Sequence, residues 1–246
     1  MDNIEEILEG VKILNRLGRD DDSIKMMDTF LEEKQDLDKN ERTIFFVVYK
    51  TAIDSSRASY RTIDAYHQQC LSDGATGKAN KLQYYKELVG TKIIDQAQKA
   101  IDIIDSILIP HAEGPAALAF YYKMKGDMYR YIAETSLQVE KQYGTIEGQT
   151  AYQRAIEICE QNLSPIDPVR LGTILNSAVF RYEHLKEKGE AFEILQHTVQ
   201  EVRDHLSEAP PEDQNEISSA YNTMLRNISI WEVGGEQEEE EKAEND

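Results

Sequence analysis

The 246-residue chain carries 27 Lys and Arg against 46 Asp and Glu, a formal net charge of −19 at pH 7, and 40% of its residues are hydrophobic. This charge opposes binding to nucleic-acid phosphates and anionic membrane surfaces, so we expect neither nucleic acid nor membrane as a partner. No apolar run approaches the ~18 residues that span a bilayer, and the first residues lack the positive segment of a secretory signal. The two cysteines form no CxxC motif, which is typical of a reducing compartment. These features predict a cytoplasmic location, with the nucleus as a further candidate.

Helical periodicity extends along most of the chain. Apolar residues recur at helical spacing, as in Ile93, Ala97, Ile101 and Leu108, with charged residues between them. Strand-like alternation is absent over any useful length, and the prolines fall in clusters that mark helix boundaries. The sequence therefore predicts an all-α fold of antiparallel helices joined by short turns. The nine expected helices span residues 2–17, 20–33, 39–70, 79–109, 115–136, 147–162, 168–186, 189–206 and 213–232.

Two segments define further boundaries. Residues 164–168 read Ser-Pro-Ile-Asp-Pro, which predicts Asp167 as an N-cap and Pro168 at the first helical position. Residues 234–246 carry seven acids and one lysine, and their mutual repulsion predicts a disordered acidic tail. The chain thus divides into a single helical domain at 1–233 and a tail at 234–246.

Two groups of cations interrupt segments that otherwise look like protein core. Lys50 lies in an apolar run, and Arg57 and Arg61 follow at +7 and +11 on the same helical face. The second group consists of Lys123, Lys125, Arg130 and the neighbouring Tyr131. In so acidic a chain these groups indicate a concave anion site, because Arg, Lys and Tyr side chains all suit phosphate oxygens. Internal pairing with carboxylates explains the pattern too, and on spacing alone it is favoured; the candidate carboxylates are Asp54, Asp127 and Glu134.

A third segment has a different character. Leu171, Leu175 and Val179 recur at four-residue spacing, whereas Asn176 and Glu183 lie seven apart on an adjoining face. An Asn side chain can bond a peptide backbone in both directions, so an amphipathic peptide groove fits. A helix–helix contact with solvent-facing Asn and Glu fits as well, and on the sequence alone it is favoured.

The sequence contains only weak signals for other functions. Residues 121–129 and 151–158 resemble one unit of a tetratricopeptide array, but no second copy appears at a period of about 34 residues. A phosphorylation-independent helical peptide-binding scaffold of that type is kept as the alternative. No P-loop, GxGxxG or HExxH motif is present, and the five histidines are scattered. We therefore expect no catalytic residues, no metal and no cofactor.

Four segments, at 42–52, 122–134, 168–183 and 227–231, resemble in order and spacing the hallmark segments of the 14-3-3 family. The resemblance implies a cup-shaped, usually dimeric, all-helical adaptor, not an enzyme. Such an adaptor binds phosphoserine or phosphothreonine segments of client proteins and regulates their activity, location or assembly. The resemblance implies that four residues hold the phosphate, namely Lys50, Arg57, Arg130 and Tyr131. It also implies a peptide groove, on helices between 39 and 232, that contains Lys123, Leu175, Asn176, Val179, Glu183, Asn227, Ile230 and Trp231.

The resemblance further implies a homodimer formed through residues 1–109. The apolar contacts would come from Ile13, Leu14, Leu17, Ile63, Tyr66 and Tyr85. Relatives commonly add inter-subunit salt bridges at the positions matching Arg19 and Asp22. The residues expected opposite them here are Lys92 and Leu88, which cannot complete these bridges. We therefore expect a homodimer that is weakened or altered in geometry.

The chain also departs from the family pattern near the expected ligand. Ala220 and Thr223 stand where large aliphatic residues are usual, and Arg226 stands where an acid is usual, so the groove wall should be shallower.

Asp54 stands where a small residue is usual. It lies four residues after Lys50 and three before Arg57, so it can pair with either and should repel an incoming dianion.

Overall fold

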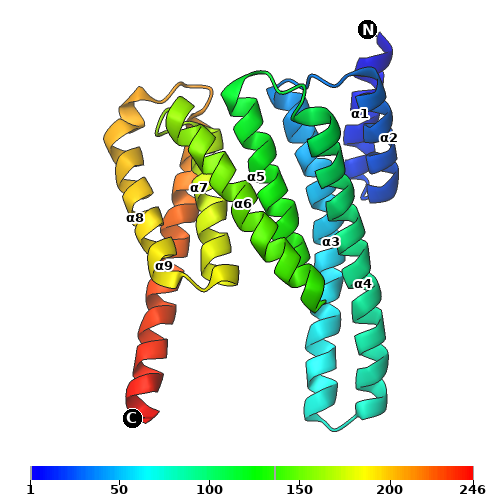
Figure 1. The fold of residues 1–246 in the computed structure, drawn as a ribbon, viewed down its shortest axis with the longest axis vertical. Coiled ribbons are helices and arrows are strands. Elements are labelled where there is room, and N and C mark those ends of the chain that lie inside the picture. Colours follow the sequence, from blue (N-terminus) through cyan, green and yellow to red (C-terminus); the bar gives the residue numbers. More distant parts are fainter. Residues whose placement is uncertain (1, 136, 246) are drawn as a thin grey trace. The chain divides into compact units, whose positions relative to one another are not determined.

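The computed structural model describes residues 2–135 and 137–245, and it describes the side chains of residues 4–135 and 137–233. In these residues the chain forms nine α-helices and no strand (Figure 1), which confirms the predicted all-α class. None of the described helices combines the length and apolar character that a bilayer span requires. The acidic tail predicted at 234–246 lies outside the described side chains and stays a prediction.

The helices match most of the predicted ranges. Short π-helices at Ile104–Leu108 and Arg181–Leu185 extend the fourth and seventh helices, and a 3₁₀ turn at Leu206–Glu208 follows the eighth. The α-helices are α1 Asp2–Arg16, α2 Asp20–Glu33, α3 Lys39–Ser72, α4 Thr76–Ile103, α5 Gly114–Ala133, α6 Gln138–Asn162, α7 Pro168–Phe180, α8 Lys188–His205 and α9 Gln214–Asn245.

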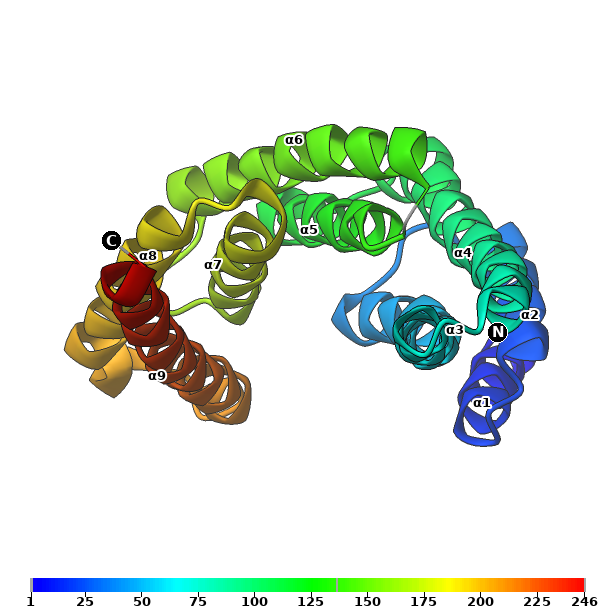
Figure 2. The same ribbon diagram turned by 90° about the horizontal axis from the view of Figure 1, so that it is seen from below.

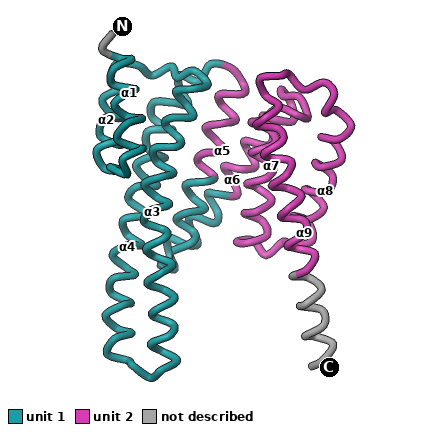
Figure 3. The backbone as a smooth tube through the Cα atoms, turned by 180° about the vertical axis from the view of Figure 1, so that it is seen from behind, with its two compact units in different colours: residues 1–113, 127–148 teal, residues 114–126, 149–246 magenta. Residues whose placement is uncertain are grey.

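The chain divides into two compact units (Figure 3). Unit 1 contains residues 1–113 and 127–148, and unit 2 contains residues 114–126 and 149–246. The boundary between the units falls within α5 and again within α6.

Unit 1 is built on the long helices α3 and α4, which run side by side, with α1 and α2 packed next to them (Figures 1 and 2). Helix α3 begins with a capping box, in which Asp38 accepts from the backbone N–H of Glu41 and Glu41 accepts from that of Asp38, both at 2.8 Å. The core includes the fully buried Phe30, Phe45 and Tyr49. Because no Gly or Pro interrupts residues 40–70, α3 continues well past the core.

Unit 2 contains the α7, α8 and α9 bundle. The predicted start of α7 is confirmed, since Asp167 accepts from the backbone N–H of Val169 at 2.8 Å and Pro168 is the first helical residue. Buried residues from the three helices then form one core, as Leu171, Leu195 and Met224 illustrate.

The prediction for α6 is wrong at its first residue, because the helix begins at Gln138 and not near residue 147. Gly144 and Gly148 have low helix propensity, yet both are buried inside the helix. A Cβ at position 144 would lie 2.7 Å from the backbone oxygen of Tyr129 and 2.9 Å from the nitrogen of Ala133. Gly144 therefore allows α6 to pack closely against α5, which a reading of local propensity cannot show.

Candidate functional site

The four residues predicted to hold phosphate all lie in unit 1. Lys50 and Arg57 come from α3, and Arg130 and Tyr131 come from α5. Tyr131 is buried, and the Cζ atoms of Arg57 and Arg130 lie 4.4 and 4.8 Å from its ring centroid. The two guanidinium groups therefore converge on one aromatic ring, an arrangement that cation–π attraction stabilises.

The carboxylates proposed as alternative partners are also present in the cluster. Arg57 donates from Nε and Nη2 to the two carboxylate oxygens of Glu134, at 2.7 and 2.6 Å. Glu134 also accepts from Arg130 at 3.3 Å and from Arg61 at 3.4 Å. Internal ion pairing thus exists, and it holds the arginines in place at the junction of α3 and α5.

Asp54 pairs with both cations that its position in the sequence suggested. Its Oδ1 accepts from Arg57 Nη1 at 2.6 Å, and its Oδ2 forms an ion pair with Lys50. Burial alone would raise the pKa of Asp54, but the hydrogen bonds and positive charges of Lys50 and Arg57 outweigh it, so this pKa lies below its ordinary value. Asp54 is therefore an anion that already occupies part of the cation cluster.

The side chains of the cluster differ in their exposure to solvent. The side chains of Arg57 and Arg130 are 13% and 14% exposed, whereas those of Lys50 and Asp54 are 45% and 34% exposed. Burial raises the pKa of Tyr131, and the charge of Asp127 adds to this effect, so the phenol keeps its proton. The cluster thus presents a partly exposed Lys–Asp pair in front of two largely buried guanidinium groups.

The residues predicted for the peptide groove lie in unit 2. Leu175, Asn176 and Val179 on α7 are half-buried, and the side chain of Glu183 is 51% exposed. Lys123 on α5 approaches α7, since its Cε lies 3.5 Å from where a Cβ at Gly172 would be.

On α9 the predicted groove residues show the same mixture of packing and exposure. Asn227 and Trp231 are half-buried, whereas Ile230 is 60% exposed. The ring of Trp231 stacks on Tyr182 at a centroid distance of 4.3 Å and an interplanar angle of 4°. Tyr182 was missed in the sequence, although it directly precedes the predicted Glu183. Since α7 contacts α9, these residues form a partly exposed amphipathic surface of unit 2.

Three residues of α9 depart from the family pattern, and each has few contacts of note. Ala220 packs against the core of unit 2, the Thr223 hydroxyl donates to the backbone oxygen of Ser219 at 2.8 Å, and Arg226 is exposed. The chain therefore has no large aliphatic side chain at positions 220, 223 and 226.

The residues predicted for dimer contacts belong to unit 1. Leu14 and Ile63 are half-buried, and the other four are exposed by 50% or more, namely Ile13, Leu17, Tyr66 and Tyr85. Tyr84 and Leu88 on α4, which are 60% and 50% exposed, extend this set.

The charged residues predicted near the dimer contacts interact within the chain. Arg19 pairs with Asp22, whose Oδ2 lies 2.6 Å from Nη2 and 2.7 Å from Nε. The positive charge of Lys92 acts on Asp20, where it opposes the rise in pKa that burial and the neighbouring Asp21 produce. Within unit 1, Arg19 and Asp22 therefore already satisfy one another.

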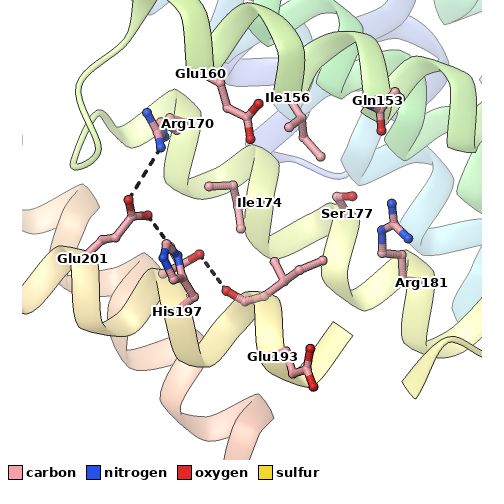
Figure 4. Close-up of a pocket in the computed structure, with 12 residues that line it drawn as sticks. Gln153, Ile156, Glu160, Arg170, Ile174, Ser177, Arg181, Glu193, His197 and Glu201 are labelled. Atoms are coloured by element: carbon pink, nitrogen blue, oxygen red, sulfur yellow. Dashed lines mark hydrogen bonds and ion pairs between the residues drawn. The ribbon is translucent and has the colours of Figure 1, made fainter. Parts of the chain in front are cut away.

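A separate cavity of about 570 Å³ lies in unit 2, lined by residues of α6, α7 and α8 and by Arg181 of the π-helix that extends α7 (Figure 4). Arg170 points toward Glu201 with 3.9 Å between Nη2 and Oε1, and His197 lies 3.6 Å from the same carboxylate. Arg181, which also lines the cavity, pairs with Glu187 at 2.6 Å. None of the predicted phosphate or groove residues lines this cavity.

These features define an all-helical protein in which two arginines converge on one buried tyrosine. The 14-3-3 family model matches residues 10–232. The chain is 30% identical over 241 residues to 14-3-3 protein beta/alpha-A of Xenopus laevis, covering 98% of each chain. It is 32% identical over 244 residues to 14-3-3-like protein 1 of Caenorhabditis elegans, covering 98% of this chain and 96% of that relative. The chain therefore belongs to the 14-3-3 family, whose members are adaptors.

Proposed function

We propose that this protein is a phosphoserine- and phosphothreonine-dependent adaptor that binds phosphorylated segments of client proteins and regulates their activity, location or assembly. The observation that carries the proposal is the convergence of Arg57 and Arg130 on Tyr131, with Lys50 joined to the same cluster through Asp54.

Phosphate suits this cluster because its oxygens can accept several charge-assisted hydrogen bonds at once. The guanidinium of Arg57 is already oriented by Glu134, so little side-chain freedom is lost when a ligand binds. Burial alone would lower the pKa of Arg57, but Glu134 outweighs it and keeps that pKa above its ordinary value. Arg57 therefore keeps its positive charge at neutral pH.

Unit 2 supplies the proposed recognition of the peptide itself. Asn176 and Asn227 would bond the ligand backbone, because an amide side chain donates and accepts at once. Leu175, Val179 and Ile230 would contact apolar side chains of the ligand. The further groove residues in this proposal are Lys123, Glu183 and Trp231.

Paired calorimetric titrations test the proposal with one serine-containing peptide, prepared with and without its phosphate. Binding of the phosphorylated form alone is the expected result. Equal affinity for both forms would favour the alternative, a phosphorylation-independent scaffold of tetratricopeptide type. The variant Arg130→Ala should remove most of the affinity for the phosphorylated form, whereas Arg154→Ala, at an exposed arginine in unit 2, is the matched control.

We also propose that the protein forms a homodimer through unit 1. The support is the set of exposed apolar side chains on α1, α3 and α4, such as Ile13, Tyr66 and Tyr85. Burial of each large apolar side chain contributes about 1.5–3 kcal/mol, whereas an exposed salt bridge contributes about 0–1 kcal/mol. Because Arg19 and Asp22 already pair within one chain, the apolar contacts would carry the association.

A further inference from the structure

The ion-pair network around Arg57 contains more cations than carboxylates. It links four cations, Lys50, Arg57, Arg61 and Arg130, with three carboxylates, Asp54, Asp127 and Glu134. Tyr131 keeps its proton and adds no charge. These seven side chains together carry a net charge of one positive unit, and they would carry two without Asp54.

We infer that Asp54 matches this site to a singly charged oxyanion and so reduces the advantage of a phosphate dianion over a monoanion. The inference rests on the proposed phosphate-binding function. A monoanion would bring the network to neutrality, whereas a dianion would leave one uncompensated negative charge. With an uncharged residue at position 54, the dianion would be the ligand that brings the network to neutrality.

Asp54 is held close to the cations that a ligand needs. It is joined to Arg57 one turn later and to Lys50 one turn earlier on α3, so both partners are fixed by the same helix. Its side chain is 34% exposed, whereas Glu134 is 19% exposed and is bonded by three arginines. An incoming anion therefore meets Asp54 first and must share Lys50 and Arg57 with it.

The size of the effect follows from the extra charge on the dianion. At a separation of about 5 Å, Asp54 repels a dianion more strongly than a monoanion by the energy of one further unit of charge. This energy depends on the local dielectric constant, and a dielectric constant between those of water and the protein interior gives roughly a tenfold difference in affinity. Asp54→Asn keeps the size and the hydrogen-bonding oxygen of the side chain but removes its charge. This variant should therefore change selectivity between the two anions, in addition to raising affinity.

The test uses one peptide in three forms, measured by calorimetry at about pH 7.5. Phosphoserine is mainly a dianion there, because its second pKa is about 6. Its methyl phosphodiester is a monoanion, and the unmodified serine carries no charge. Each form is titrated into the wild type, Asp54→Asn, Asp54→Ala and the control Asp95→Asn, which removes an exposed charge on α4.

The expected result is that the ratio of dianion to monoanion affinity rises about tenfold in both Asp54 variants and stays unchanged in Asp95→Asn. Phosphate-dependent binding with the same ratio in the wild type and both Asp54 variants would overturn this inference and leave the proposed function intact. Equal binding of the unmodified peptide and both phosphate forms by every variant would overturn the proposed function and this inference together.

Discussion

Arg57 on α3 and Glu134, the residue that directly follows α5, form a two-point ion pair at 2.7 and 2.6 Å. The fork fixes the orientation of the guanidinium, and the ring of Tyr131 supports it from one face. Glu134 therefore positions Arg57 and does not simply compete with a ligand for its charge. The position of the arginine is thus set before any ligand arrives.

The substitution Arg57→Lys should separate charge from geometry at this site. A lysine keeps the positive charge but cannot form the fork with Glu134, so the orientation of the cation is lost. We expect the affinity for a phosphoserine peptide to fall at least about tenfold, since each charge-assisted hydrogen bond contributes about 1.5–3 kcal/mol. Calorimetry measures this loss, and a thermal melt checks that the variant is folded. An unchanged affinity would mean that charge alone is sufficient at position 57.

The buried Lys86 predicts a pH-dependent contribution to stability. Its side chain is 10% exposed, bonds Asp64 at 2.5 Å and lies over the ring of Tyr60. The hydrogen bond from Lys86 lowers the pKa of Asp64 below its ordinary value of 3.8. A lowered folded-state pKa stabilises the protein above the unfolded-state pKa, and this contribution is lost as the pH falls through the folded-state value.

We expect Asp64→Asn to reduce the free energy of unfolding at pH 7 by about 1 kcal/mol, because Lys86 loses its charged partner but water screens the pair at Asp64, whose side chain is 40% exposed. The wild type and the variant should converge in stability as the pH is lowered below about 4. Urea unfolding at several pH values measures both effects. A difference that is the same at pH 7 and at pH 3 would contradict the assignment to this ion pair.

Two glycines in helices should respond in opposite directions to alanine. At Gly144 a Cβ would lie 2.7 Å from a backbone oxygen, so Gly144→Ala should destabilise unit 1 by about 1–3 kcal/mol. At Gly77 on α4 a Cβ meets nothing within 4 Å, so Gly77→Ala should stabilise by about 0.5–1 kcal/mol. Thermal unfolding of the pair tests the close approach of α5 and α6 at Gly144, and equal effects would argue against it.

The apolar surface of unit 1 predicts which substitution weakens the dimer. Leu17 is 67% exposed, and Leu17→Asp would place a charge among the apolar residues proposed to meet the partner. We expect a monomer at concentrations where the wild type is dimeric. Val139→Asp is the matched control, because Val139 is 76% exposed on α6, outside the proposed contact. Sedimentation equilibrium at micromolar concentration measures both, and a strictly monomeric wild type would contradict the proposed dimer.

Local features of the sequence predicted most of the helices, whereas the roles of the site residues came from the family resemblance and stay a prediction. The N-cap at Asp167 depends on residues within one turn, and Asp54 could be paired with Lys50 and Arg57 from their helical spacing. The fork between Arg57 and Glu134 joins residues 77 positions apart, so the sequence suggested Glu134 as a partner without its geometry. The close approach at Gly144 and the stacking of Tyr182 on Trp231 also depend on packing between helices, which local patterns do not contain.

The central claim is that Arg57 and Arg130 together bind the phosphate of a ligand. Nuclear magnetic resonance of the arginine side-chain Nε–H groups tests it most directly, with signals assigned through Arg57→Lys and Arg130→Lys. We predict that a phosphoserine peptide shifts the signals of both arginines, whereas the same peptide without its phosphate leaves them in place. Binding of the phosphoserine peptide with both signals unmoved would contradict the claim.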